Sequence, residues 1–423
     1  MSDPMNDAVP HPSPRAAATA LLGGFGFLML GNGMQGSLIG VRAEIEGFSS
    51  AWTPIIIAAY FAGYLAGTKV ALRTLAQVGH IRVFAALASL ASTASLLYAV
   101  VLSPPMWVLL RLVTGMCLAG LYVVVESWLN AITTNITRGQ LLGAYMTVST
   151  AGIGLGQLLL NVADPAGVKL FILASILASL SLIPIALSTT SAPPVVAPEP
   201  LPIRQLYTLM PPGVVAAALV GVSQGTIMGM ASIYASREGL SGFSLSAFLF
   251  APLVGATVLQ FPVGRWSDRV HRRSALAVVA ASAGALSLSL LFVRPDSVIA
   301  LAILFVAGGA IFPLYSVSLA FLNDNLPAEY LMAGSAGYVL LSGIGAFFGP
   351  LITGGLMSAI GPSGYFVVLG GIPLLLALYL GVRITTKEAI PVEDQGDWVP
   401  TARGAGALAA VDERRKLRNR RRD

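Results

Sequence analysis

The chain has 423 residues, of which 56% are hydrophobic and only 10% are charged, and its formal net charge at pH 7 is +6. A chain of this length normally forms two or three soluble domains, but a mean hydropathy of +0.79 excludes that class. Apolar runs of about 20 residues, each long enough to cross a bilayer core of ~30 Å, recur along the sequence. The single cysteine, Cys117, excludes an intrachain disulfide framework.

The first half of the chain contains six predicted spans, near residues 17–41, 52–72, 83–101, 106–128, 139–162 and 168–187. Asp3 and Asp7 precede the first basic residue, and no small-residue cleavage pattern follows a short apolar core. We therefore expect the first span to remain in the membrane. Residues 189–212 are rich in Pro, Ser and Ala, which is typical of a linker.

The second half contains six more spans, near residues 214–235, 245–264, 274–293, 298–322, 331–360 and 365–382. This predicts an all-α integral membrane protein with a cytoplasmic N-terminal tail (1–15), a six-helix bundle (16–188), a cytoplasmic linker (189–212), a second six-helix bundle (213–384) and a tail (385–423). The last segment ends in the basic stretch RRKLRNRRR and is expected to be disordered. We expect it to be solvated or to bind anionic lipid, and not to bind nucleic acid.

The strongest local anomaly is a charged segment at residues 264–273, GRWSDRVHRR, which lies between two apolar runs and is called the knot below. Loop charge predicts the topology. With both termini in the cytoplasm, the inner segments hold about 20 Lys and Arg against roughly four outside. The four outer residues are Arg42, Lys169, Arg237 and Arg294.

Short matches between the two halves predict an internal duplication. Gln35 and Gly36 match Gln224 and Gly225 at an offset of 189 (224 minus 35), and Gly120 and Ser127 match Gly309 and Ser316 at the same offset. Tyr145, Ser149, Gly152 and Gly156 match Tyr338, Ser342, Gly345 and Gly349 at an offset of 193 (338 minus 145). Two parallel copies of a six-helix unit imply a pseudo-two-fold axis along the membrane normal and alternating access by rocking of the halves.

The knot resembles the loop signature G-x3-D-R-x-G-R-R of the major facilitator superfamily, through Gly264, Asp268, Arg269, Arg272 and Arg273. His271 stands where Gly is usual, and the first-half copy is reduced to Gly79 and Arg82. Arg111 and Gly115 match the R-x3-G pattern of the family's fourth span. The segment 124–158, with VVES, RG, LL, AYM and GQL, is similar to the YcaD-like branch of bacterial members.

The resemblance implies twelve transmembrane helices in two pseudo-symmetric six-helix bundles, in a bacterial plasma (inner) membrane. It implies a monomeric secondary transporter that moves a small solute by alternating access, with protons as the coupling ion and without a cofactor. Two alternatives are open. One is an efflux antiporter for drug-like amphiphiles, and the other is a non-transporting membrane sensor or lipid-handling protein, which erosion of the first loop signature favours.

The resemblance also implies that the knot is a cytoplasmic gate that ties helix ends together when the inner side is closed. Asp324, after the tenth span, is the nearest candidate partner by topology, because arginine pairs strongly with carboxylates. The alternative is a charge cluster that sets topology and has no gating role.

Two ionisable residues lie inside the fourth span, where a charge is costly and usually faces protein or a water-filled space. Arg111 either binds an anionic substrate or senses the coupling step, or it braces the first and fourth spans through backbone carbonyls. Glu126 is either the proton carrier or the ion-pair partner of Arg138, Arg73 or Arg82. The two residues are 15 positions apart, about 22 Å along a helix, and therefore do not pair directly.

Polar side chains within apolar spans form the candidate substrate site. Asn32, Gln35 and Gln224 either line the cavity or form hydrogen bonds between helices, since a buried amide needs a partner. Tyr145, Gln157 and Tyr315 belong to the same candidate set.

Enzyme chemistry is not expected. The GYLAGTK segment at residues 63–69 has the wrong spacing for a phosphate-binding loop. Three scattered histidines and one cysteine do not suggest a metal site. The sequence therefore predicts a transporter and leaves its substrate, direction and coupling ion open.

Overall fold

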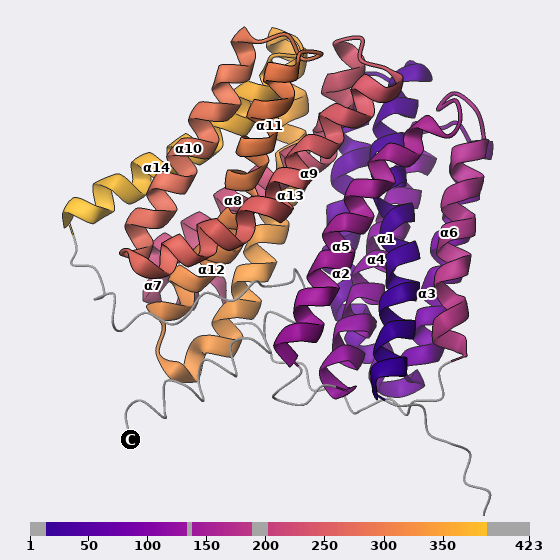
Figure 1. Ribbon diagram of the computed structural model, residues 1–423, viewed down its shortest axis with the longest axis horizontal. Coiled ribbons are helices and arrows are strands. Elements are labelled where there is room, and N and C mark those ends of the chain that lie inside the picture. The colour runs from indigo at the N-terminus through magenta and orange to yellow at the C-terminus, as the bar shows by residue number, and fades with distance from the viewer. Residues whose placement is uncertain (1–13, 133–137, 188–201, 387–423) are drawn as a thin grey trace, which may run out of the picture.

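The computed structural model describes residues 14–132, 138–187 and 202–386, which are all-helical and form two bundles side by side (Figure 1). The N-terminal bundle comprises α1 (Pro14–Ile45), α2 (Trp52–Val78), α3 (His80–Val100), α4 (Pro104–Ile132), α5 (Arg138–Leu158), η1 (Leu159–Asn161) and α6 (Lys169–Ala186). The C-terminal part comprises α7 (Ile203–Leu209), α8 (Pro211–Arg237), α9 (Gly242–Arg269), α10 (Arg272–Ser289), η2 (Leu290–Phe292), α11 (Val298–Ile311), α12 (Pro313–Asp324), η3 (Ala328–Tyr330), α13 (Leu331–Ile360) and α14 (Gly364–Thr386).

The predicted membrane architecture is confirmed. Within the described ranges, ten helical segments are long and apolar enough to cross a membrane, with α11 and α12 counted as one segment. α1 and α5 are not among these ten, but they pack against each other in the N-terminal bundle at the places of the first and fifth predicted spans. Apolar helices bury their backbone polar groups in their own hydrogen bonds, which is why this sequence crosses the membrane as helices.

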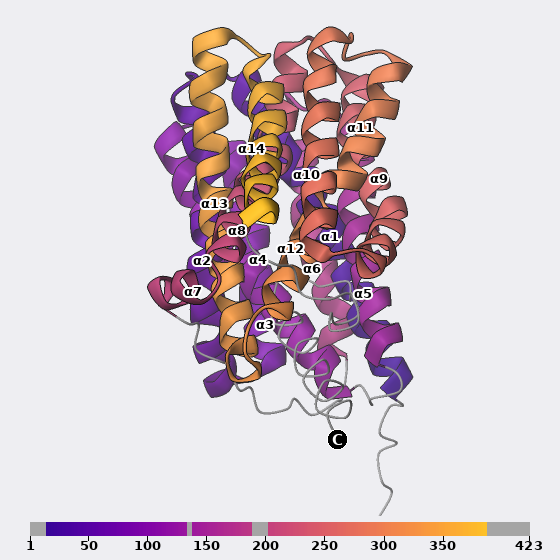
Figure 2. The same cartoon turned by 90° about the vertical axis from the view of Figure 1, so that its left-hand side faces the viewer.

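Two elements differ from the prediction. The tenth span is broken at Phe312, between α11 and α12, because Pro313 has no amide hydrogen to continue the helical ladder. A short helix, α7, lies inside the predicted linker 189–212 and at one side of the C-terminal bundle (Figure 2). Its Leu206 is fully buried and lies near Gly334 of α13, so hydrophobic contact holds this part of the linker.

Glycines set the closest helix contacts. A Cβ atom added to Gly63 of α2 would lie 2.0 Å from the carbonyl oxygen of Leu112, and one at Gly115 of α4 would lie 2.0 Å from that of Tyr60. The C-terminal bundle repeats this pair, with Gly255 against Phe305 and Gly308 against Pro252. Small residues allow helix backbones to approach closely where van der Waals packing drives association.

The glycine contacts also correct the register of the repeat. Gly33 of α1 packs on the carbonyl of Ile153, and Gly225 of α8 packs on that of Ala346. Gly225 is therefore the structural counterpart of Gly33, at an offset of 192 (225 minus 33). The predicted pairing of Gln35 with Gln224, at an offset of 189 (224 minus 35), is therefore wrong by three residues. A shift of three residues keeps side chains on nearly the same helix face, so a comparison of the two half-sequences does not detect it.

The other register prediction is confirmed. Gly156 of α5 packs on the carbonyl of Leu30, and Gly349 of α13 packs on that of Val222, so the 193-residue offset between these helices holds. Gly115 and Gly308 give the same offset of 193 for α4 and α11, in place of the predicted 189. Each position in one bundle can thus be compared with its counterpart in the other.

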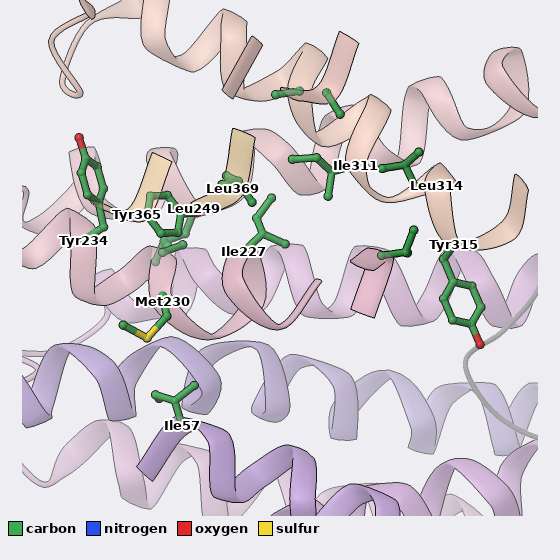
Figure 3. Close-up of a cluster of buried hydrophobic side chains, with 14 of the residues drawn as sticks. Ile57, Ile227, Met230, Tyr234, Leu249, Ile311, Leu314, Tyr315, Tyr365 and Leu369 are labelled. Carbon is green, nitrogen blue, oxygen red and sulfur yellow. The ribbon is translucent and has the colours of Figure 1, made fainter. Parts of the chain in front are cut away.

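The two bundles approach each other at one end and separate toward the other (Figure 1). α1 packs on α8, α2 on α13 and α5 on α9. Near the first end Ile57 of α2 lies opposite Met230 of α8, and both belong to one apolar cluster (Figure 3). We call this the latch end and the opposite one, which holds the knot, the knot end.

Candidate functional site

At the latch end an ion pair joins the two bundles. Arg237, in the last turn of α8, donates from Nε and Nη2 to the two carboxylate oxygens of Glu44 near the end of α1, each at 3.0 Å. Both side chains are about one-fifth exposed. A second contact between the bundles runs from Asn161 Nδ2 to Ser246 Oγ, at 2.8 Å. The bidentate geometry of the first contact is the strongest form of an arginine–carboxylate pair.

This pair, which we call the latch, was not predicted from the sequence. Arg237 entered only as one of the outer positive charges, and Glu44 was not singled out. The available signal was the spacing, because Glu44 and Arg237 are opposite charges at the ends of equivalent helices and lie 193 residues apart.

The knot forms a cluster of ion pairs within the C-terminal bundle. Arg272 is 2% exposed, and its guanidinium contacts Asp268 Oδ1 at 2.5 Å and Asp324 Oδ2 at 3.1 Å. Asp324 is the partner that the topology suggested. Arg273 Nη1 donates to the carbonyl oxygen of Arg383 at 3.1 Å. Four helices of one bundle, α9, α10, α12 and α14, are thereby joined at their ends.

The remaining knot residues lie in the last turns of α9. Gly264 is buried, and its carbonyl oxygen accepts a hydrogen bond from Ser267 at 2.7 Å. Arg269 is exposed. The contacts described here hold the C-terminal bundle together, and a gating role for the knot stays a prediction.

Glu126 lies in the half of α4 toward the knot end and is fully buried. Its Oε1 accepts a hydrogen bond of 2.7 Å from the hydroxyl of Tyr145 on α5. Arg138, an alternative partner in the prediction, begins α5, and its side chain lies outside the described residues. The counterpart of Glu126 at an offset of 193 is the buried Leu319, so this carboxylate belongs to one bundle only.

Arg111 is 5% exposed and lies in the half of α4 toward the latch end. Its guanidinium carbon is 4.6 Å from the centroid of the Tyr60 ring, a cation–π geometry. Its Nε has no hydrogen-bond partner, and no carboxylate lies within 4.0 Å in the described part of the chain. The expected bracing bonds from this side chain to backbone carbonyls are not found among the described residues. Leu304 occupies the equivalent place in the other bundle.

A row of aromatic rings connects the two charged residues of α4. The Tyr60 and Tyr64 ring centroids are 6.3 Å apart, and those of Tyr64 and Tyr122 are 6.2 Å apart. Tyr122 contacts Phe25 at 5.4 Å, which stacks on Tyr145 at 4.9 Å. None of Tyr60, Tyr64 and Tyr122 was predicted from the sequence as a site residue. The signal for Tyr122 was its position 11 residues after Arg111, on the same face of α4.

Two predicted amides hold helices of the N-terminal bundle together. Gln35 Nε2 donates to Ser95 Oγ on α3 at 2.9 Å. Gln157 on α5 accepts from Ser37 Oγ at 2.6 Å and donates to the carbonyl of Gly33 at 3.0 Å. Of the two interpretations of these residues, the contacts favour interhelical hydrogen bonding.

Asn32 and Gln224 are different. They occupy equivalent positions on α1 and α8, at an offset of 192 (224 minus 32), and neither side chain has a hydrogen-bond partner within the described ranges. Tyr315 on α12 is the counterpart of Tyr122 and meets the Tyr338 ring edge-on at 5.2 Å. Its ring projects away from Ile311 and Leu314 (Figure 3).

Comparisons with known proteins agree with this architecture. Residues 21–308 and 213–421 match the profile described as Major Facilitator Superfamily. An uncharacterized MFS-type transporter, YE1530 of Yersinia enterocolitica, is 28% identical over 333 residues, which are 77% of this chain and 85% of that protein. The uncharacterized MFS-type transporter YcaD of Escherichia fergusonii is 28% identical over 368 residues, 85% of this chain and 94% of that protein.

Two solved structures share the fold. The nucleoside transporter NupG has a TM-score of 0.74 at 13% identity, with 88% of this chain and all of that chain covered. A bacterial homologue of the human lysosomal transporter Spinster, in an inward-facing and unoccupied conformation, has a TM-score of 0.66 at 14% identity, with 96% and 98% covered. The predicted resemblance to the superfamily, with YcaD among its relatives, is confirmed.

Proposed function

Because the chain belongs to the Major Facilitator Superfamily and is a membrane transporter rather than an enzyme, we propose that it moves a small solute across the bacterial inner membrane by alternating access, with protons as the coupling ion. One observation carries the proposal. The bundles are joined at the latch end by Glu44 and Arg237 and separate toward the knot end. This asymmetry is what one of two alternating states requires, since rocking of the halves exposes a central site to one side at a time.

The knot end is the cytoplasmic end in this proposal. Cytoplasmic loops of membrane proteins carry an excess of Lys and Arg, and the knot holds the densest basic cluster within the described ranges. The structure then corresponds to the inward-facing state. The knot would act as a gate in the opposite state, when the inner ends of the bundles approach each other.

Glu126 is the proposed proton carrier. It is a buried carboxylate on the bundle that also holds Arg111, and intramembrane carboxylates mark proton relays in transporters. The hydroxyl of Tyr145 donates a hydrogen bond to it, and the aromatic row extends from this pair toward Arg111.

Transport is tested by solute counterflow in proteoliposomes. Metabolites and drug-like amphiphiles that raise the melting temperature of the purified protein are loaded inside, and uptake of the labelled compound is followed from outside. We expect transient accumulation above equilibrium, which only a cycling carrier produces. Compounds that bind but never exchange would instead show a sensor, and exchange limited to amphiphiles would show the efflux alternative.

A further inference from the structure

We propose that the carboxamides of Asn32 and Gln224 form a shared subsite for a neutral solute that carries adjacent hydrogen-bond donor and acceptor groups, as in a carboxamide, a lactam or a nucleobase. This inference rests on the proposed function, because it places the subsite on the proposed transport path. It adds the chemical class of the solute.

The corrected repeat shows which faces of α1 and α8 meet. Near the latch end a Cβ atom added to Gly40 would lie 2.4 Å from Ser232 Oγ, so the two helices touch there. These residues are themselves counterparts, at an offset of 192 (232 minus 40). The contact therefore lies close to the pseudo-two-fold axis that relates the bundles.

One turn toward the knot end, the same two faces have separated. The next pair on these faces is Gly36 and Met228, again at an offset of 192. A Cβ atom at Gly36 would meet no atom within 4 Å, so open space begins at this level. A further turn along, the pair is Asn32 and Gln224, about 12 Å from the Gly40 contact at 1.5 Å per residue. The two carboxamides thus lie on facing helices where the gap has opened.

Asn32 and Gln224 differ in their hydrogen bonding from the other two amides of the candidate site. Gln35 and Gln157 are bonded to neighbouring helices. Asn32 is half-buried and Gln224 is 6% exposed, and within the described ranges no protein group bonds either side chain. No atom of either carboxamide is both fully buried and without a partner, so water or a bound solute can reach and satisfy both groups.

The chemistry of the pair favours a neutral ligand. Each carboxamide offers one carbonyl acceptor and two N–H donors, and together they carry no net charge. They therefore match a group that presents a donor beside an acceptor. An ionised group at the same place would lose hydration without gaining a counter-charge from them.

The test measures binding to the purified full-length protein in nanodiscs, by thermal shift and by equilibrium dialysis. Nicotinamide and uracil probe the neutral class, and nicotinate is the anionic analogue of the first. We expect the neutral probes to bind, nicotinate to bind at least tenfold more weakly, and N32L or Q224M to weaken the neutral probes by roughly tenfold each, the loss of about one hydrogen bond.

Asn325 provides the matched control, because its side chain donates to the Phe321 carbonyl at 2.8 Å in the last turn of α12. We expect N325L to bind the probes as the wild type does. Failure of both neutral probes to bind the wild type at ~10 mM, or equal binding by wild type and N32L, would overturn the subsite. Binding that depends on Asn32 and Gln224 without counterflow would keep the subsite and reject transport.

Discussion

A buried carboxylate is the residue on which proton coupling would depend. Glu126 is fully buried in α4 and accepts a hydrogen bond from Tyr145. We expect E126Q to abolish accumulation driven by a pH gradient and to preserve counterflow, because the amide keeps the hydrogen bond but carries no exchangeable charge. Uptake is measured in proteoliposomes with and without the gradient. Gradient-driven uptake that survives in E126Q would assign the residue a structural role.

Tyr145 and Tyr338 allow a paired test of the same site. They are counterparts at an offset of 193, but Tyr338 bonds Ser318 and not a carboxylate. Y145F removes one buried hydrogen bond and Y338F removes two, because the Tyr338 hydroxyl also donates to the Tyr315 carbonyl at 3.3 Å, so the variants should lose about 1 and about 2 kcal/mol of stability. We expect only Y145F to shift the pH dependence of uptake. Equal pH profiles for the two variants would mean that Tyr145 has no role in proton coupling.

Some individual residues of the candidate site could be predicted from the sequence and others could not. Arg111 and Glu126 were recognisable because ionisable residues are rare in apolar spans. Tyr60 and Tyr64 were not, since tyrosine is compatible with both the interior and the interface of a bilayer. Gln35 and Asn32 are three residues apart on one helix, and only the three-dimensional contacts showed that the first bonds Ser95.

Helix packing depends on glycine where backbones touch. At Gly63 an added Cβ would lie 2.0 Å from the Leu112 carbonyl oxygen, which belongs to a helix backbone and has no freedom to rotate away. We expect G63A to destabilise the protein by about 1–3 kcal/mol, as overpacking does. Thermal unfolding in detergent measures the change.

Gly371 in α14 is the control for this change. An added Cβ at Gly371 meets nothing within 4 Å. Because alanine favours helix by about 1 kcal/mol over glycine, G371A should leave the melting temperature unchanged or raise it. A melting temperature of G63A that matches that of G371A would show that α2 and α4 are not held at this distance.

Element boundaries could be predicted to the extent that hydropathy defines them. The spans were visible because a segment that crosses a bilayer is filled with apolar residues, as ten helical segments in the described part of the chain are. The break at Phe312 was not predicted, because Pro occurs within spans such as α9 and α13 without ending the helix. The predicted offset between α1 and α8 was wrong because both helices contain several glycines, so short matches between their sequences occur at more than one offset.

The arrangement of the two bundles relative to each other belongs to the whole molecule and was not predictable in detail. The duplication predicted two bundles and a pseudo-two-fold axis. Which ends meet depends on contacts between residues far apart in the sequence, such as Glu44 with Arg237. In the proposed mechanism these contacts exist in one access state only. Charge distribution also distinguishes the bundles, since Arg111 and Glu126 have Leu304 and Leu319 as counterparts.

The latch should set the balance between the two access states. A cysteine at Gly36, where space opens between α1 and α8, reports which side is open; Cys117 is buried and is replaced by alanine in the background. In E44Q or R237Q the bidentate pair is lost at the latch end. The latch end is the outer side in the proposed topology. If the pair contributes about 1–2 kcal/mol to closure of that side, labelling of G36C by an impermeant maleimide from the outside should rise roughly 5–30-fold.

The exposed ion pair of Arg294 and Asp296 is the control for the latch, because it lies within the turn between η2 and α11 of one bundle and is open to solvent. R294Q should leave the labelling unchanged, since such pairs contribute little. The charge-swapped double variant E44R/R237E should restore protection, because it rebuilds the contact with opposite polarity. Protection that persists in E44Q, or that R294Q removes equally, would mean that the apolar contacts around Ile57 and Met230 close the outer side without the latch.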